Sequence, residues 1–186
     1  MSFARLQVVC LPGASYLLAA NMPAVDLSAP GAGTVATTAL AGGKAANANY
    51  DKVSGWRTGH AESAQITYDP SQISYGRLLQ IFFPVVHHPT QIDRQGPDFG
   101  SQYRSVIFYT SEGQEKVAPA YISRIEHAHV FHDPIATHVL LLPGFFSAED
   151  HHQHYLQQHP DDSYIVQYDV PKLQALEQQF PDLVKP

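Results

Sequence analysis

Two polar segments of the chain carry the residue types that acid–base chemistry requires. Residues 57–62 end in Glu62, at the start of an alternating apolar run, and residues 87–104 include Asp98 and Tyr103. Loops at strand ends are where sites are usually built. A carboxyl group half-buried at the mouth of a strand has a raised pKa and can donate a proton near neutral pH. Glu62 is therefore a candidate general acid.

Each of these residues also has a structural interpretation, and the pattern alone leaves the choice open. Glu62 could form an ion pair with Arg57 or Arg104 instead of transferring a proton. Asp98 follows a proline and could cap a turn, or it could orient a base or a hydroxyl group. Tyrosines such as Tyr103 are common at the edge of a core.

The 11 histidines and the single cysteine limit the metal chemistry that the chain supports. Histidines cluster at residues 127–132 and 151–154, but no acidic or thiolate partner completes a credible set of ligands. No metal site is therefore expected. One cysteine, Cys10, also excludes an intrachain disulfide and a zinc site with several cysteines.

Hydrophobic periodicity predicts the elements that position these residues. Strands are expected at residues 6–10, 61–68, 106–109 and 139–142, with 61–68 in the centre of the sheet and a further edge strand at 164–166. Residues 34–40 are the β-favouring part of a stretch rich in small residues. Helices are expected over residues 16–22, 74–83, 113–127, 148–159 and 170–180, with Ser71 or Ser74 and Ser111 as N-caps. Strands and helices interleave without a repeat, which indicates one α+β or mixed α/β domain over 1–186.

Composition excludes several classes of partner. The chain has 186 residues, with 11 Lys and Arg against 17 Asp and Glu and a formal net charge of −6. Nucleic acids and anionic membranes bind clustered cations, which this chain lacks. No apolar run reaches the roughly 18 to 20 residues that span a bilayer. The first residues lack the basic flank and apolar stretch of a signal peptide, so a cytoplasmic location is expected.

Nine short motifs together give the chain a specific resemblance. In order, they are AGGK (41–44), NANY (47–50), RTGHAE (57–62), YDP (68–70), ISY (73–75), HHPTQ (87–91), DRQGPD (93–98), GSQYRS (100–105) and AEDHHQHYL (148–156). Over roughly residues 35 to 180 the chain resembles the A-type peptide methionine sulfoxide reductase family. So many ordered matches are more specific than any lone motif.

The resemblance implies a fold, a reaction and roles for particular residues. The implied fold is an α+β two-layer sandwich with a ferredoxin-like βαββ core and a long coiled C-terminal segment. Family members reduce the S-epimer of methionine sulfoxide: a cysteine thiolate attacks sulfur, the oxygen leaves after protonation, and an external thiol reduces the sulfenic acid. Glu62 matches the proton donor, Tyr50 and Tyr103 match the hydroxyls that bind the sulfoxide oxygen, and Asp98 matches the acid beside them. Substrate contacts are expected from Ser15, Tyr16, Trp56, His60 and His87.

The nucleophile is where the chain differs from the family pattern. The motif Gly-Cys-Phe-Trp-Gly, in which a helix N-terminus lowers the thiol pKa, does not occur in this sequence. Aligning the first strands puts Ala14 or Ser15 at the cysteine position, and this alignment is favoured. Aligning cysteine with cysteine instead selects Cys10. A serine hydroxyl cannot form the sulfenic intermediate, so reduction requires Cys10.

Three hypotheses from different classes follow. The first is a sulfoxide reductase that uses Cys10, needs no bound cofactor and depends on an external thiol, thioredoxin-like or small. The second is a redox-inactive enzyme in which Glu62, Asp98, Tyr50 and Tyr103 perform acid–base chemistry, such as condensation, cyclisation or isomerisation, on another small molecule. The third is a catalytically silent protein that binds methionine sulfoxide or a related ligand. The reductase ranks first because the matched residues support it directly.

Overall fold

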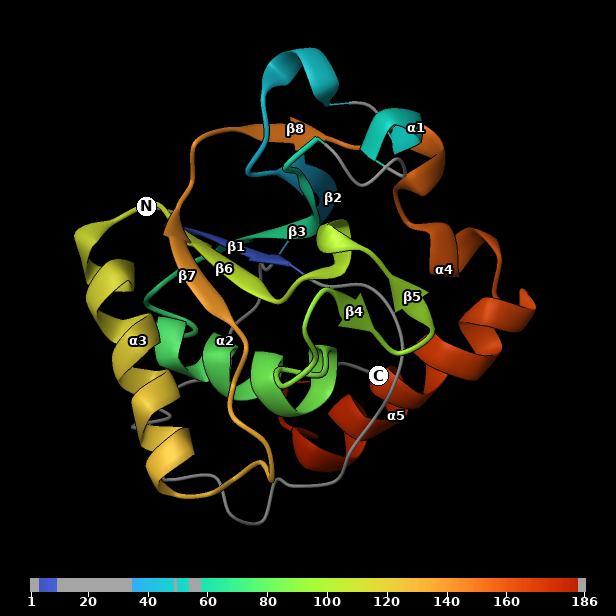
Figure 1. The fold of residues 1–186 in the computed structure, drawn as a ribbon. Coiled ribbons are helices and arrows are strands. Elements are labelled where there is room, and N and C mark those ends of the chain that lie inside the picture. The colour runs from blue at the N-terminus through green and yellow to red at the C-terminus, as the bar shows by residue number, and fades with distance from the viewer. Residues whose placement is uncertain (1–3, 10–34, 49, 54–57, 184–186) are drawn as a thin grey trace.

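The framework is a six-stranded sheet, seen in the computed structural model, which describes residues 4–9, 35–48, 50–53 and 58–183 (Figure 1). Its strand order is β7-β6-β1-β3-β2-β8. The strands are β1 (Ala4–Val9), β2 (Val35–Ala41), β3 (Ala61–Tyr68), β6 (Val106–Tyr109), β7 (His138–Leu141) and β8 (Phe145–Ser147). All neighbouring pairs are antiparallel except β6 and β7, which are parallel.

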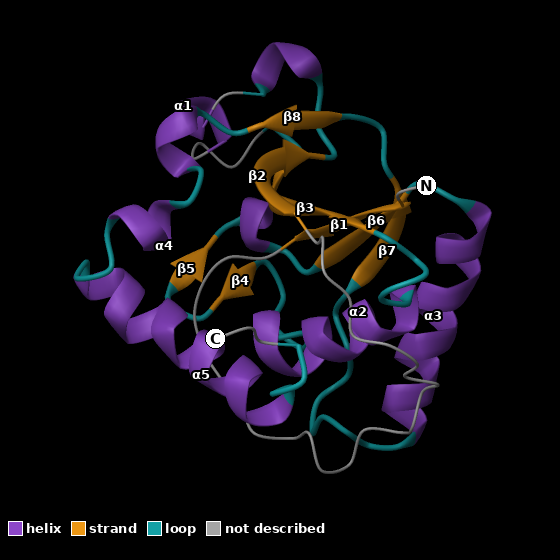
Figure 2. Ribbon diagram, turned by 180° about the vertical axis from the view of Figure 1, so that it is seen from behind, coloured by secondary structure: helices purple, strands orange, loops and turns teal. Residues whose placement is uncertain are grey.

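Helices α2 (Tyr75–Ile81) and α3 (Glu112–His127) cover one face of this sheet (Figure 2). The core between them contains Tyr68 of β3, Ile107 of β6, and apolar side chains from both helices. Alternate residues of a strand share a face, so Glu62 points to the same side of the sheet as Tyr68. The candidate acid therefore faces the helical layer.

The remaining short elements surround one end of the sheet. They are η2 (Ala45–Asn47), α1 (Tyr50–Val53), the hairpin of β4 (Arg94–Gln95) and β5 (Asp98–Phe99), and η4 (Ser101–Tyr103). A π-helical turn, η3 (Phe82–Val86), continues α2, and the C-terminal part consists of η5 (Asp150–His152), α4 (Tyr155–Gln158), η6 (Ile165–Asp169) and α5 (Val170–Gln179). The mixture of sheet and helices is the α+β class that was predicted.

Most of the predicted elements within the described residues are confirmed. The strands at 61–68 and 106–109 have the expected bounds, and 61–68 is central, between β1 and β2. Ser74 and Ser111 are N-caps, since their hydroxyl groups accept hydrogen bonds from the backbone N–H groups of Arg77 and Gln114. The predicted helix at 16–22 lies outside the described residues.

Two predictions in the C-terminal part were wrong. Residues 164–166 are helical rather than an edge strand, because the Asp162 carboxylate accepts a hydrogen bond from the backbone N–H of Tyr164 at 2.8 Å and begins the turn that leads into η6. The helix expected over 148–159 is interrupted at His154, whose φ is 55°. This polar stretch has little apolar surface to pack, and packing is what stabilises most protein helices.

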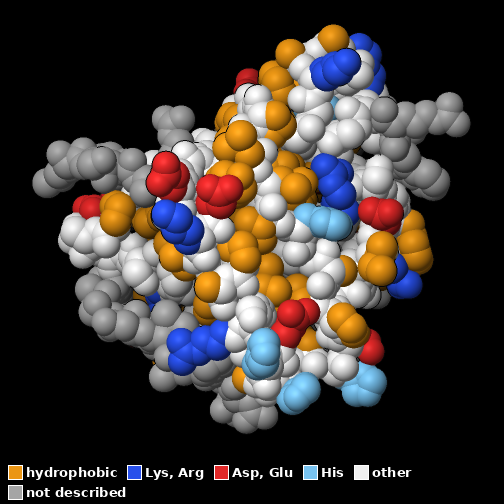
Figure 3. Space-filling view, turned by 60° about the vertical axis from the view of Figure 1, so that its left-hand side comes forward, with side chains coloured by type: hydrophobic (Ala, Val, Ile, Leu, Met, Phe, Trp, Pro, Cys, Tyr) orange, Lys and Arg blue, Asp and Glu red, His pale blue; other side chains and the backbone are white. Residues whose placement is uncertain are grey.

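The edge strand β7 exposes apolar side chains. Leu140 and Leu141 are 45% and 63% exposed, and Val117 of α3 is 42% exposed. The side of the molecule on which α3 and β7 lie comes forward in Figure 3, where a band of apolar side chains runs between charged ones. No helix of the described residues is long and apolar enough to cross a membrane.

Candidate active site

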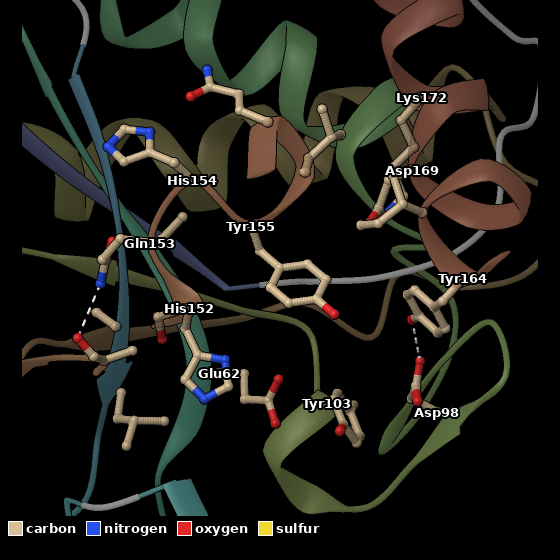
Figure 4. A pocket seen from close by; sticks show the side chains of 18 of the residues that line it. Glu62, Asp98, Tyr103, His152, Gln153, His154, Tyr155, Tyr164, Asp169 and Lys172 are labelled. Atoms are coloured by element: carbon tan, nitrogen blue, oxygen red, sulfur yellow. Dashed lines mark hydrogen bonds and ion pairs between the residues drawn. The ribbon is translucent and has the colours of Figure 1, made fainter. Parts of the chain in front are cut away.

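A cavity of about 720 Å³ lies beside the Glu62 end of β3. Its lining comes from four parts of the chain: the sheet, the β5–η4 region, residues 148–157 and residues 164–173 (Figure 4). The polar and titratable residues in this lining are Glu62, Ser63, Asp98, Tyr103, His152, Gln153, His154, Tyr155, Gln157, Tyr164, Asp169 and Lys172. Side chains from Ala39 to Leu173, far apart in the sequence, therefore converge on one space.

Glu62 is the central titratable group of the cavity. Its neighbour in β2 is Leu40, and its Oε1 atom is buried with no hydrogen-bond partner among the described residues. Burial raises the pKa of this carboxyl to about 7, the charge of Asp98 adds to the increase, and a hydrogen bond with Tyr103 opposes it. Near neutral pH a large fraction of Glu62 is thus protonated, as a general acid requires.

The ion-pair alternative for Glu62 is not realised by Arg104. The guanidinium group of Arg104 donates to the carbonyl oxygens of Gly59, His60 and Ser101 at 3.0, 3.1 and 2.7 Å. These contacts fix the loop before β3 to the η4 turn. Arg57, the other suggested partner, lies outside the described residues.

Asp98 orients a tyrosine that the sequence analysis did not include in the site. The Tyr164 hydroxyl donates a 2.6 Å hydrogen bond to Oδ2 of Asp98, and burial together with this bond raises the Tyr164 pKa (Figure 4). Of the two uses considered for Asp98, the structure shows the orientation of a hydroxyl group. Tyr164 was missed because residues 164–166 have the composition of a strand, and 66 positions separate it from Asp98.

Tyr155 and His152 are among the further polar side chains of the cavity that were not predicted. Tyr155 points into the space between Glu62 and Tyr164 in Figure 4. His152 lies beside Glu62, and burial, followed by the charge of His151, lowers the His152 pKa. Both residues belong to the AEDHHQHYL motif, which was the available sequence signal.

The structure does not bring His60 and His87 to the cavity, although both were expected to contact substrate. His60 is 1% exposed, and its ring accepts from the backbone N–H of Gly43 at Nδ1 and donates from Nε2 to the carbonyl of Lys44. A Cβ atom on Gly43 would overlap this ring, so a glycine is needed there. His60 therefore fixes the loop around Gly43 in place.

His87 is a neutral core histidine. Its Nδ1 donates to the carbonyl of Phe82 at 3.2 Å, so its Nε2 accepts from the Ser105 hydroxyl at 2.7 Å, and the ring stacks on Phe82. Ser105 in turn accepts from the Thr137 hydroxyl at 2.7 Å. Burial, the largest cause, lowers the pKa of His87 to about 3.

This low pKa predicts a loss of stability in acid. Between about pH 6.5 and pH 3 the unfolded chain protonates His87 and the folded chain does not, so the free energy of unfolding falls as the pH falls, by at most about 1.4 kcal/mol per pH unit. In urea titrations over this range, His87→Asn is expected to be less stable at pH 7.5 but to show a shallower pH dependence. Equal slopes for the two proteins would exclude this contribution.

Several predicted site residues cannot be compared with the cavity. Tyr50 begins α1, but its side chain is not described. The remaining four positions, Cys10, Ser15, Tyr16 and Trp56, lie outside the described residues. In the described part of the chain, no group of three or more His, Cys, Asp and Glu residues could hold a metal ion.

The register of β1 bears on the position of its C-terminal end. Val8 pairs with Ala64 of β3, and Val9 pairs with Val106 of β6. The strands β1 and β3 are antiparallel, so the end of β1 from which the chain continues to residue 10 lies at the Glu62 end of β3.

Comparisons with known proteins show which sequences this chain is similar to. A family model described as peptide methionine sulfoxide reductase matches residues 29–183. The chain is 50% identical over 148 residues to "Peptide methionine sulfoxide reductase MsrA 2" of Synechocystis sp., covering 80% of this chain and 69% of that protein. It is 45% identical over 148 residues to the protein of the same name from Mesorhizobium japonicum, covering 80% and 76%.

Solved structures give the same result. The reduced form of Mxr1 from Saccharomyces cerevisiae has a TM-score of 0.68 and 26% identity, covering 86% of this chain and 87% of that one. Methionine sulfoxide reductase A of Corynebacterium diphtheriae has a TM-score of 0.59 and 25% identity, covering 85% and 76%. The family match begins at residue 29, so it does not include Cys10.

Proposed function

Because the chain belongs to the peptide methionine sulfoxide reductase family, we propose that its cavity reduces methionine sulfoxide, free or within a polypeptide, with Glu62 as proton donor. The observation that carries this proposal is the buried Glu62 carboxyl, with a pKa of about 7, hydrogen-bonded to Tyr103. A sulfoxide oxygen leaves only when it is protonated, so the reaction needs an acid that still holds its proton near pH 7.

The hydroxyl groups around Glu62 suit the other requirement of the reaction, which is to hold the oxygen in place. Tyr103 lies next to Glu62, and Tyr164, fixed by Asp98 at 2.6 Å, lies across the cavity (Figure 4). Tyr50 is a third candidate by its place in the NANY motif. Hydroxyl groups oriented before the reaction stabilise charge on the departing oxygen without reorganising in the transition state.

The nucleophile in this proposal is Cys10, the single thiol of the chain. Consecutive Cα atoms are about 3.8 Å apart, and Cys10 follows Val9, where β1 ends beside the Glu62 end of β3. The Cys10 thiolate attacks the sulfoxide sulfur and is oxidised by two electrons to a sulfenic acid. The S–O bond of the substrate breaks, the substrate is reduced by two electrons to the thioether, and the oxygen, protonated by Glu62, ends on the Cys10 sulfur as the hydroxyl of the sulfenic acid.

Regeneration requires an external thiol, because this chain has no second cysteine. One thiol condenses with the sulfenic acid, releasing water and forming a mixed disulfide, and a second thiol releases Cys10 as the free thiol. Each methionine formed therefore consumes two thiol equivalents. No bound cofactor takes part in this scheme.

An assay resolved by sulfoxide epimer tests the proposed function. The protein is incubated with dithiothreitol and an N-acetylated methionine sulfoxide of mixed configuration, and the remaining epimers are quantified by chiral chromatography. The S-epimer should disappear with one dithiothreitol oxidised per methionine, and the R-epimer should remain. Consumption of neither epimer, with the protein folded, would instead favour a redox-inactive role for the cavity.

A further inference from the structure

One wall of the cavity comes from the C-terminal helical segment. Tyr164, Ile165 and Asp169, together with Lys172 and Leu173 of α5, line the cavity opposite Glu62 (Figure 4). Lys172 is 8% exposed, and its ammonium group donates to Asp169 at 3.0 Å. That ion pair lies within the segment itself, so it does not attach the wall to the rest of the protein.

Besides the packing of α5 against η3, side-chain interactions at both ends of this segment connect it to the rest of the protein. At its start, inside the cavity, the Tyr164 hydroxyl binds Asp98 at 2.6 Å. At its far end, after α5, the chain passes through Phe180, which is 4% exposed, to Asp182. Both Phe180 and Asp182 contact Arg77 of α2, outside the cavity.

Arg77 makes a dense set of contacts although it does not line the cavity. Its Nη2 donates to both carboxylate oxygens of Asp182, at 3.2 and 3.0 Å, and its Nη1 donates to Oε1 of Gln80 at 2.9 Å. Its Cζ lies 4.8 Å from the centroid of the Phe180 ring. One guanidinium group therefore holds the polypeptide on both sides of residue 181.

The direction in which α5 runs along α2 and η3 explains how the Arg77 contacts limit movement of the cavity wall. The helix α2 continues into η3, against which α5 packs, and the charge of Lys172, in the first turn of α5, acts on His87, directly after η3. Beyond the other end of α5, Asp182 reaches Arg77, near the start of α2. The segment α5 therefore runs antiparallel along α2 and η3. Because a helix moves as a rigid element, fixing its far end also limits how its first turn can tilt relative to Glu62.

The magnitude of the interaction depends on its burial. Exposed ion pairs contribute little, in the range of about 0 to 1 kcal/mol. The Arg77 side chain is 11% exposed and that of Asp182 is 52% exposed, so the ion pair is partly in solvent, and the cation–π contact of the buried Arg77 with Phe180 adds to it. Together, these contacts of Arg77 hold Phe180 and Asp182 in one position relative to α2.

We propose that Arg77 is a positioning residue for substrate binding: by holding Phe180 and Asp182 against α2, it keeps α5 in place and with it Asp169, Lys172 and Leu173 in the cavity wall. This inference rests on the proposed function for its kinetic readout. It assigns Arg77 no contact with substrate. Its loss should therefore weaken substrate binding and leave the chemical step unchanged.

Three variants test this role in the full-length chain. Arg77→Met keeps the apolar stem but removes the charge, Asp182→Asn removes the carboxylate, and Arg77→Lys keeps a charge without the planar fork. For Arg77→Met and Asp182→Asn we expect KM for the sulfoxide to rise about fivefold, the effect of roughly 1 kcal/mol, with kcat changed less than twofold. Arg77→Lys should show a smaller rise in KM. The control is Lys116→Met, which removes an exposed ion pair with Glu112 on α3.

A second readout separates this inference from the proposed function. In Arg77→Met and Asp182→Asn, the backbone N–H groups of residues 165–179, Pro171 excepted, should exchange hydrogen faster than in the unaltered protein, whereas those of β3 should not. In the Lys116→Met control, neither region should change. Unchanged KM and unchanged exchange in both variants would overturn the positioning role. A fall in kcat with constant KM would also overturn it. If the unaltered protein reduces no sulfoxide, the proposed function fails, and the exchange result still decides whether Arg77 holds α5.

Discussion

Glu62→Gln is expected to lower kcat for methionine sulfoxide reduction by about 10²- to 10⁴-fold, the usual contribution of a general acid. Glutamine has nearly the shape of a protonated carboxyl and retains a hydrogen-bond donor, but it transfers no proton. KM should change little, since Tyr103 and Tyr164 remain in the cavity. Steady-state kinetics at pH 7 with dithiothreitol as reductant measures this effect.

The stability of Glu62→Gln distinguishes loss of chemistry from loss of fold. The folded-state pKa of Glu62 is raised from 4.5 to about 7, so the free energy of unfolding falls as the pH rises through this range and stays lower above it. At pH 8 the glutamine variant should therefore melt no lower than the unaltered protein. Glu115→Gln is a matched control, because Glu115 is an exposed carboxylate that also accepts from a tyrosine hydroxyl, that of Tyr109 at 2.8 Å. Its kinetics should be unchanged; full activity in Glu62→Gln would rule out Glu62 as the acid.

Cys10→Ser is expected to reduce sulfoxide turnover to the rate measured without protein. The serine hydroxyl has a pKa far above that of a thiol and forms no sulfenic acid, and no other thiol exists in the chain to replace it. Turnover is measured in the same assay, and the intermediate is measured independently. A single addition of methionine sulfoxide without reductant should yield one methionine per chain and a sulfenic acid that dimedone traps, located at Cys10 by mass spectrometry.

The variant also decides between the two alignments of the N-terminal segment. If Cys10→Ser retains turnover, the thiol is not the nucleophile, and the alignment that places Ala14 or Ser15 at the nucleophile position leaves the cavity without redox chemistry of its own. Cys10→Ala, which removes the hydroxyl as well, should behave as Cys10→Ser does. A difference between these two variants would indicate that an oxygen at this position takes part.

The elements that local signals define were predictable from the sequence. The alternation from Ala61 to Tyr68 and the apolar run from Val106 to Tyr109 specify their strands, and Ser74 and Ser111 specify two helix starts through their hydroxyl groups. Residues 164–166 were not predictable in the same way. Their β-favouring composition is overridden by the turn that Asp162 begins and by the burial of Ile165 at 4% exposure.

The candidate site was predictable where a motif and a strand end coincide. Glu62, Asp98 and Tyr103 were expected together, and all three line the cavity. Tyr164 and Lys172 were not expected, because their place depends on how the C-terminal segment folds back over the sheet, which no local pattern specifies.

For two histidines, in contrast, a motif predicted a substrate contact and the structure places the residue outside the cavity lining. His60 and His87 belong to motifs rich in functional residues, yet the structure gives both rings backbone or hydroxyl partners inside the protein. A motif shows that a residue type is needed, and only the folded contacts show whether chemistry or packing needs it.

The pH dependence of kcat/KM, compared between the unaltered protein and Glu62→Gln, tests most directly the claim that Glu62 donates the proton. The unaltered protein should lose activity as the pH rises through about 7, because Glu62 then loses its proton. The residual activity of Glu62→Gln should lack this alkaline limb. An alkaline limb at the same pH in Glu62→Gln would contradict the account, because another group would then control the protonation of the departing oxygen.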